Sequence, residues 1–199
     1  MEVTSNQIKQ GTVTGCRAGG LRLTGVLRPL LSLALLGSLA IGPVRAQGLN
    51  EYQVKAAFLY NFAKFIEWPA DAFGSNSDPL IIGVIGDDPF GGALNQTISG
   101  KSISGRPLVV RHLRWGQDLR ACHILYISSS EGRRIPQIIQ SVKGGSVLTI
   151  GDTDHFNQQG GIINFILEAN KVRFEINVRG AEHARLRISS KLLALSRNR

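Results

Sequence analysis

The sequence is poor in cysteine, since only Cys16 and Cys122 occur among 199 residues. Two cysteines exclude a disulfide-dense scaffold and any cysteine-rich zinc module. The chain also lacks the H-E-x-x-H zinc motif and the G-x-S-x-G nucleophile elbow. A catalytic triad assembled in space stays open, but these absences argue against an enzyme. The composition, 43% apolar and 19% charged, is globular and excludes a disordered, collagen-like or coiled-coil chain.

Long hydrophobic runs are missing as well. A membrane-spanning helix needs about 20 apolar residues, and the stretch 30–41 (LLSLALLGSLAI) has 12. Arginines precede this stretch, and Val-Arg-Ala at 44–46 ends it before Gln47. A basic flank, a short apolar core and small residues at the cleavage position are typical of a secretory signal peptide. We therefore expect residues 1–46 to be removed and the protein to reside in the periplasm.

Nearly half of the net positive charge lies in this leader. Removing residues 1–46 takes away five basic residues and one acid, so the formal net charge falls from +9 to +5. With so modest a charge and an exported location, nucleic acid is not an expected partner. Cys122 is then the one remaining cysteine, and its apolar surroundings (ACHILYI) favour a buried position. Residues 47–199 are enough for one domain with its own core.

Strands and helices alternate along residues 47–150. Continuous apolar runs predict buried strands, and apolar residues at helical spacing predict helices that cover them. The strands are expected at 80–85, 107–113, 122–127 and 147–150, and the helices at 50–66 (with Asn50 as N-cap), after Asp88-Pro89 (with Asp88 as N-cap) and at 135–142. This order predicts an α/β fold with a largely parallel sheet and helices on both sides.

The C-terminal part departs from this alternation. Residues 162–168 and 171–177 flank Ala169-Asn170, a two-residue turn that predicts an antiparallel hairpin. The turn pairs Leu167 with Val172, and the same face continues with two further apolar pairs (Phe165 with Phe174 and Ile163 with Ile176). The opposite face is mostly charged, so one face should be core and the other solvated. A final helix is expected over residues 181–196, with Leu186, Leu192, Leu193 and Leu195 in the core.

The helix at 50–66 carries two apolar stripes, one through Val54, Phe58 and Phe62 and one through Tyr52, Leu59 and Ile66. A surface helix normally needs one stripe. Either the helix is sunk into its own domain, or one stripe packs against another chain. On the second alternative we predict a homodimer that uses Tyr52, Leu59 and Ile66.

Two acidic clusters are weak candidates for a metal-binding site. Asp87-Asp88 follows the first strand, where receiver domains hold metal-binding acids, but the end of the later strand at 122–127, where such a site requires an aspartate, reads Ser128-Ser129-Ser130. The segment 152–155 (DTDH) lacks the further ligands of an EF-hand loop. We therefore predict no metal, no cofactor and no catalytic residue.

Several segments together resemble one family. GVIGDDPFGGAL, ACHILYIS, GGSVLTIGDTDHF, GGIINF, VRFEINVRGAE and LRISSKLLAL occur in order, after EYQVKAAFLYNFAKFIEWP. Over residues 50–196 the chain resembles the YfiR family of small exported bacterial proteins. The resemblance implies a periplasmic α/β domain, commonly dimeric and without known catalysis. It also implies repression of an inner-membrane diguanylate cyclase of the YfiN type, and sequestration by an OmpA-like outer-membrane lipoprotein of the YfiB type. Control by an intramolecular disulfide does not carry over, because one cysteine remains after residue 46.

Two function classes follow. One is a protein-binding regulator that lowers cyclic-di-GMP output, and the alternative is a periplasmic module that binds a small ligand at the carboxyl ends of the parallel strands. For the regulator we predict a partner-binding surface on the hairpin and the loop before it, made of Phe156, Ile166, Glu168, Lys171, Arg173 and Glu175. The competing interpretation is an ordinary solvated face with Phe156 capping the core.

Overall fold

The structure is a computed structural model that describes residues 44–197. The predicted leader falls outside the described residues except for residues 44–46, which begin the first helix. Helix α1 (Val44–Phe65) starts before the expected N-cap, so the prediction that Asn50 caps it is wrong. No helix in the described part of the chain is long and apolar enough to cross a membrane.

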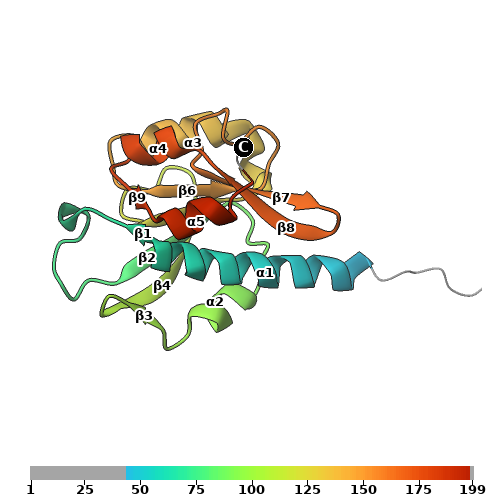
Figure 1. The fold of residues 1–199 in the computed structure, drawn as a ribbon, viewed down its shortest axis with the longest axis horizontal. Coiled ribbons are helices and arrows are strands. Elements are labelled where there is room, and N and C mark those ends of the chain that lie inside the picture. Colours follow the sequence, from blue (N-terminus) through green and yellow to red (C-terminus); the bar gives the residue numbers. More distant parts are fainter. Residues whose placement is uncertain (1–43, 198–199) are drawn as a thin grey trace, which may run out of the picture. The chain divides into compact units, whose positions relative to one another are not determined.

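A seven-stranded sheet with the order β3-β4-β2-β5-β6-β7-β8 organises the fold (Figure 1). Every neighbouring pair from β4 to β7 is parallel, and the two outermost pairs are antiparallel. The strands are β2 (Leu80–Ile85), β3 (Ser102–Ile103), β4 (Arg106–Leu113), β5 (Ile124–Ile127), β6 (Leu148–Gly151), β7 (Ile163–Glu168) and β8 (Lys171–Ile176). The predicted fold class is confirmed.

Helices cover both faces of this sheet. On one face, α1 packs with α2 (Ala93–Ile98) and α5 (Ser190–Leu195) over the larger core cluster. On the other face, α3 (Ile135–Val142) lies over the smaller one. Short elements join these layers: β1 (Ile66–Glu67), the 3-10 helices Ala70–Ala72 and Ser129–Arg134, α4 (Val178–His183) and β9 (Arg187–Ile188). The central strands are continuous apolar runs because both of their faces are buried.

Asp88 does not cap the helix that follows it. Helix α2 begins at Ala93 with Gly92 as its N-cap, while Asp88 Oδ1 accepts a hydrogen bond from the Phe90 amide at 2.8 Å. The aspartate therefore closes a tight Asx turn, an alternative to capping that this residue type also favours. The apolar face was predicted correctly, since Phe90, Leu94 and Ile98 are all buried.

The predicted hairpin is confirmed with its register. Phe165 pairs with Phe174 and Ile163 with Ile176, and all four side chains are buried. The turn residues Ala169 and Asn170 have φ of 47° and 61°, the left-handed conformation of the hairpin turn that matches strand twist. The tip is different, because Leu167 is 55% exposed. The core therefore does not cover the apolar face of the hairpin at its tip.

The prediction of one final helix over residues 181–196 is wrong. The chain forms α4, then β9, then α5, because Ile188 pairs with Ile66 of β1 and Arg185 takes a φ of 57°. Ser189 then caps α5 by accepting from the Leu192 amide. Leu186 and Leu192 are buried as predicted, Leu193 is partly buried, and Leu195 is 67% exposed.

The prediction that Phe156 belongs to a partner-binding surface is wrong, and the competing interpretation, in which Phe156 caps the core, is confirmed. The loop from 152 to 162 returns from the end of β6 to the start of β7, and the Phe156 ring is fully buried in the smaller core cluster. Gly151 and Gly161 make room for the ring, since a Cβ on Gly151 would lie 2.6 Å from a ring carbon. Parallel strands are usually joined by a crossover helix. In the connection from β6 to β7, the Phe156 ring packs against the sheet in place of such a helix.

We expect Phe156→Ala to lower the free energy of unfolding by about 3–5 kcal/mol, because removal of a buried ring leaves a cavity. Phe174→Ala should cost a similar amount, while Trp115→Ala, at a side chain that is 47% exposed, should change stability by less than about 0.5 kcal/mol. Urea unfolding followed by circular dichroism measures all three. An unchanged midpoint for Phe156→Ala would contradict the buried position.

Candidate functional site

The outer face of the hairpin holds the predicted partner-binding residues other than Phe156. Ile166 and Glu175 are half-buried, and Glu168, Lys171 and Arg173 are exposed. Arg197 lies across this face, with guanidinium nitrogens 3.4 Å from carboxylate oxygens of both Glu168 and Glu175. The two carboxylates are therefore partly neutralised within the chain, while no ion pair of Lys171 or Arg173 is found among the described residues.

The predicted dimer stripe is not available to a second chain. Leu59 is fully buried and Ile66 is 4% exposed within a single chain, so the prediction that these two side chains form a dimer interface is wrong. Both pack in the larger core cluster, which Tyr52 joins as a partly buried side chain. The stripe is core because α1 is sunk between the sheet, α2 and α5.

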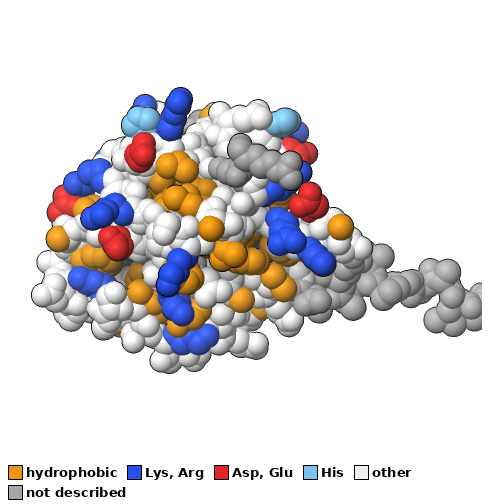
Figure 2. All heavy atoms as spheres, in the orientation of Figure 1, with side chains coloured by type: hydrophobic (Ala, Val, Ile, Leu, Met, Phe, Trp, Pro, Cys, Tyr) orange, Lys and Arg blue, Asp and Glu red, His pale blue; other side chains and the backbone are white. Residues whose placement is uncertain are grey.

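The other stripe of α1 reaches the surface. Val54 is 38% exposed and, together with the partly buried Phe58, faces the hairpin residues Leu167 and Val172 across a groove of about 380 Å³. Glu51, Lys171 and Arg173 lie along its margins. We call this apolar surface of Val54, Phe58, Leu167 and Val172 the tip groove. In Figure 2, hydrophobic side chains lie among charged ones over α1, α5 and the hairpin.

A buried ion pair lies between α1 and the end of β6. Lys55 Nζ is 2.7 Å from Asp152 Oδ2, and the two side chains are 5% and 6% exposed. The same carboxylate oxygen accepts from the hydroxyls of Tyr126 at 2.7 Å and Tyr52 at 3.1 Å. Glu51, one turn before Lys55, adds a second carboxylate at 2.6 Å from the ammonium. This cluster fills the carboxyl edge of the sheet, where the sequence placed an alternative ligand crevice.

The cluster sets the charge state of its members. Burial alone would lower the pKa of Lys55, but hydrogen bonds to Asp152 and Glu51 outweigh it and raise that pKa above its usual value. Burial, and then the neighbouring Asp152 carboxylate, raises the pKa of Tyr126 far above its ordinary value. Lys55 is therefore held as a cation and Tyr126 as a neutral donor. The sequence did not reveal Lys55, because a lysine within an amphipathic helix normally faces water.

Cys122 and His123 are structural. Burial raises the pKa of the Cys122 thiol to about 11, so the reactive thiolate is scarce at neutral pH. The sequence prediction of a buried cysteine is confirmed. Burial lowers the pKa of His123, whose Nδ1 accepts from the Ile81 amide at 3.1 Å. Within residues 44–197, no three His, Cys, Asp or Glu side chains are grouped as a metal site would require.

A protein-family model matches most of the chain. The model of the family DUF4154, described as YfiR/HmsC-like, matches residues 52–197, which include the Lys55–Asp152 pair and the tip groove. The chain belongs to the YfiR/HmsC-like family. Members of this family are periplasmic regulators in cyclic-di-GMP signalling and are known as non-catalytic. The resemblance seen in the sequence is thereby confirmed.

Other comparisons bear on the fold alone. No curated protein matches the chain. Among solved structures, the crystal structure of a conserved domain protein from Vibrio cholerae O1 biovar El Tor strain N16961 is similar with a TM-score of 0.50 and 11% sequence identity. The alignment covers 73% of this YfiR/HmsC-like chain and 59% of the Vibrio chain. The α/β architecture is therefore shared with a longer protein.

We expect Asp152→Asn to lower the free energy of unfolding by about 3–5 kcal/mol, because it removes the more buried of the two carboxylates that neutralise the Lys55 ammonium. Combining it with Lys55→Met should cost less than the sum of the two single changes. Asp71→Asn is the matched control, since its ion pair with Arg185 is equally short at 2.8 Å but more than half exposed; it should cost at most about 1 kcal/mol. Equal losses at Asp152 and Asp71 would contradict a buried pair.

We also expect stability to fall in alkali. A pKa that is raised in the folded state stabilises the protein below the ordinary pKa, and this stabilisation is lost as the pH rises toward the folded value. The ordinary values for Tyr126 and Lys55 are 10.0 and 10.5, so urea midpoints should decrease above about pH 10. Tyr126→Phe should be less stable at neutral pH and show a smaller alkaline decrease. The same decrease in both proteins would contradict the assignment to Tyr126.

Proposed function

We propose that the protein is a non-catalytic periplasmic regulator that binds the periplasmic sensor of an inner-membrane diguanylate cyclase of the YfiN type. Binding would repress the cyclase and lower cyclic-di-GMP output. Membership of the YfiR/HmsC-like family supports the signalling role. The observation that carries the proposal is the tip groove, an exposed apolar surface formed by α1 and the hairpin.

The chemistry of the tip groove suits a protein partner. Binding energy in protein interfaces concentrates in a few apolar anchors surrounded by polar residues that exclude water. Leu167 is the most exposed apolar side chain of the groove, and Phe58 gives the groove an aromatic wall that rests on Phe62 at 5.8 Å between ring centroids. Leu167 and Phe58 therefore replace Phe156 among the proposed partner-binding residues.

The charged side chains beside the tip groove indicate which side chains the partner surface carries. Lys171 and Arg173 line the groove, and their charges have no acidic partner within residues 44–197. We therefore expect an apolar partner surface bordered by acidic side chains. An OmpA-like lipoprotein of the YfiB type would relieve repression by occupying the same surface. A homodimer remains part of the proposal, with neither Leu59 nor Ile66 in its interface.

The experiment uses the exported protein as bait for detergent-solubilised membranes of its own organism. We expect mass spectrometry to identify a diguanylate cyclase with a periplasmic domain, and deletion of the bait's gene to raise cellular cyclic-di-GMP. Leu167→Glu should weaken capture by roughly tenfold or more, because a carboxylate replaces a central anchor. It should leave the urea midpoint nearly unchanged because Leu167 is exposed.

Val54 and Val109 provide a matched pair, since both are 38% exposed but only Val54 lines the tip groove. Val54→Glu should weaken capture, and Val109→Glu should not. If both groove variants capture the cyclase as well as the unaltered protein, the partner binds elsewhere. If deletion of the gene leaves cyclic-di-GMP unchanged, the regulatory function itself is wrong.

A further inference from the structure

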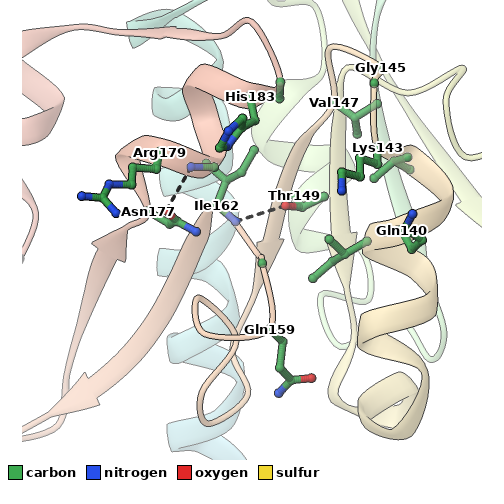
Figure 3. A pocket seen from close by; sticks show the side chains of 16 residues that line it. Gln140, Lys143, Gly145, Val147, Thr149, Gln159, Ile162, Asn177, Arg179 and His183 are labelled. Atoms are coloured by element: carbon green, nitrogen blue, oxygen red, sulfur yellow. Dashed lines mark hydrogen bonds between the residues drawn. The ribbon is translucent and has the colours of Figure 1, made fainter.

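A second surface feature lies between α3 and α4, on elements that do not form the tip groove (Figure 3). It is a pocket of about 480 Å³, within the range that small-molecule sites occupy. Val147 and Ile162, which precede β6 and β7, both line it. The pocket therefore opens at the amino-terminal edge of these strands, opposite the edge that the Lys55–Asp152 cluster fills.

The lining combines apolar walls with positive charge. Ile139, Val142, Val147 and Ile162 form apolar parts of the wall, and no aspartate or glutamate is among the lining residues. The positive charges are Lys143 at the end of α3 and Arg179 of α4, and α4 also contributes the imidazole of His183. Figure 3 shows Lys143 and His183 on opposite sides of the pocket, and the Arg179 side chain at its outer margin.

Lys143 and Arg179, the two cations of the lining, have no acidic partner among residues 44–197. None of the ion pairs between described residues involves Lys143, Arg179 or His183. Nearby, Arg120 donates to the Lys143 carbonyl oxygen at 2.8 Å, which brings a further positive charge to the end of α3. Unpaired positive charges beside low-dielectric walls attract anions more strongly than cations spread over an open surface.

The pocket also contains a buried hydroxyl. Thr149 is 2% exposed, and its Oγ1 accepts a hydrogen bond from the Ile162 amide at 3.1 Å (Figure 3). A hydroxyl has one proton to donate, and no hydrogen bond given by Thr149 Oγ1 is found within residues 44–197. This proton is available to an acceptor oxygen in the pocket.

From these features we infer that the pocket binds a small organic anion with an apolar body. The anionic group would lie within reach of Lys143, and the body would pack on the apolar walls. The shared chemistry is a carboxylate or a phosphate on a ring or branched chain. The inference stands apart from the proposed repression, because it concerns different residues and is measured on the isolated protein.

The experiment titrates the exported protein with benzoate and, separately, with benzamide, a neutral molecule of nearly the same shape. Two-dimensional ¹H–¹⁵N NMR follows the amides of Gly144, Gly145, Gly160 and Gly180, which line the pocket. We expect saturable shifts of these signals with benzoate at millimolar concentrations and much smaller ones with benzamide. Phenyl phosphate, titrated in the same way, distinguishes a phosphate site from a carboxylate site by its relative affinity.

Lys143→Gln should weaken benzoate binding by roughly tenfold, as expected for loss of one charge-assisted contact. Arg179→Gln should weaken it less, because that side chain lies at the margin. Lys191→Gln is the control, an exposed lysine of α5 that does not line the pocket. The spectra themselves report whether each variant is folded.

Three results would overturn the inference. They are the absence of saturable shifts with either anion, equal shifts with benzoate and benzamide, and equal benzoate affinity in Lys143→Gln and Lys191→Gln. None of them bears on cyclase capture, so the proposed function would stand or fall separately.

Discussion

The position of α1 depends on how one charge is buried. Lys55 lies on the helix face that meets the sheet, and its ammonium can be removed from water only because Asp152 and Glu51 both lie within 2.7 Å of it. Two tyrosine hydroxyls satisfy the same Asp152 oxygen. Apolar packing alone would allow α1 to slide along the sheet, whereas a buried ion pair tolerates little displacement. The cluster therefore fixes where α1 lies over β5 and β6.

Aromatic packing fixes the position of α1 against the hairpin. Phe62 lies 5.7 Å from Phe165 and 5.0 Å from Phe174 between ring centroids, which joins α1 to both strands of the hairpin. Because the hairpin register places these two phenylalanines opposite each other, Leu167 and Val172 follow one pair nearer the tip, on the same face. The tip groove is thus the continuation of the core beyond the last covered residue.

Much of this fold could be predicted from the sequence. Continuous apolar runs located β2, β5 and β6, and the Ala169-Asn170 turn gave the hairpin register, because both signals are local. The errors arose where distant segments decide the outcome. Phe156 lies in a loop without strand periodicity, and only its packing against Gly151 and Gly161 buries it. The C-terminal segment breaks into two helices because Ile188 pairs with Ile66, a residue 122 positions earlier in the chain.

The candidate sites were harder to predict for the same reason. The two stripes of α1 were recognised, but periodicity cannot tell which stripe a neighbouring element covers. The sheet covers Leu59, while the hairpin tip leaves Val54 partly exposed. Lys55 and Asp152 were invisible as a pair because 97 residues separate them. A buried charge requires a partner, so an aspartate that directly follows a buried strand is the signal that could have identified the carboxyl edge of the sheet as the place where α1 is held.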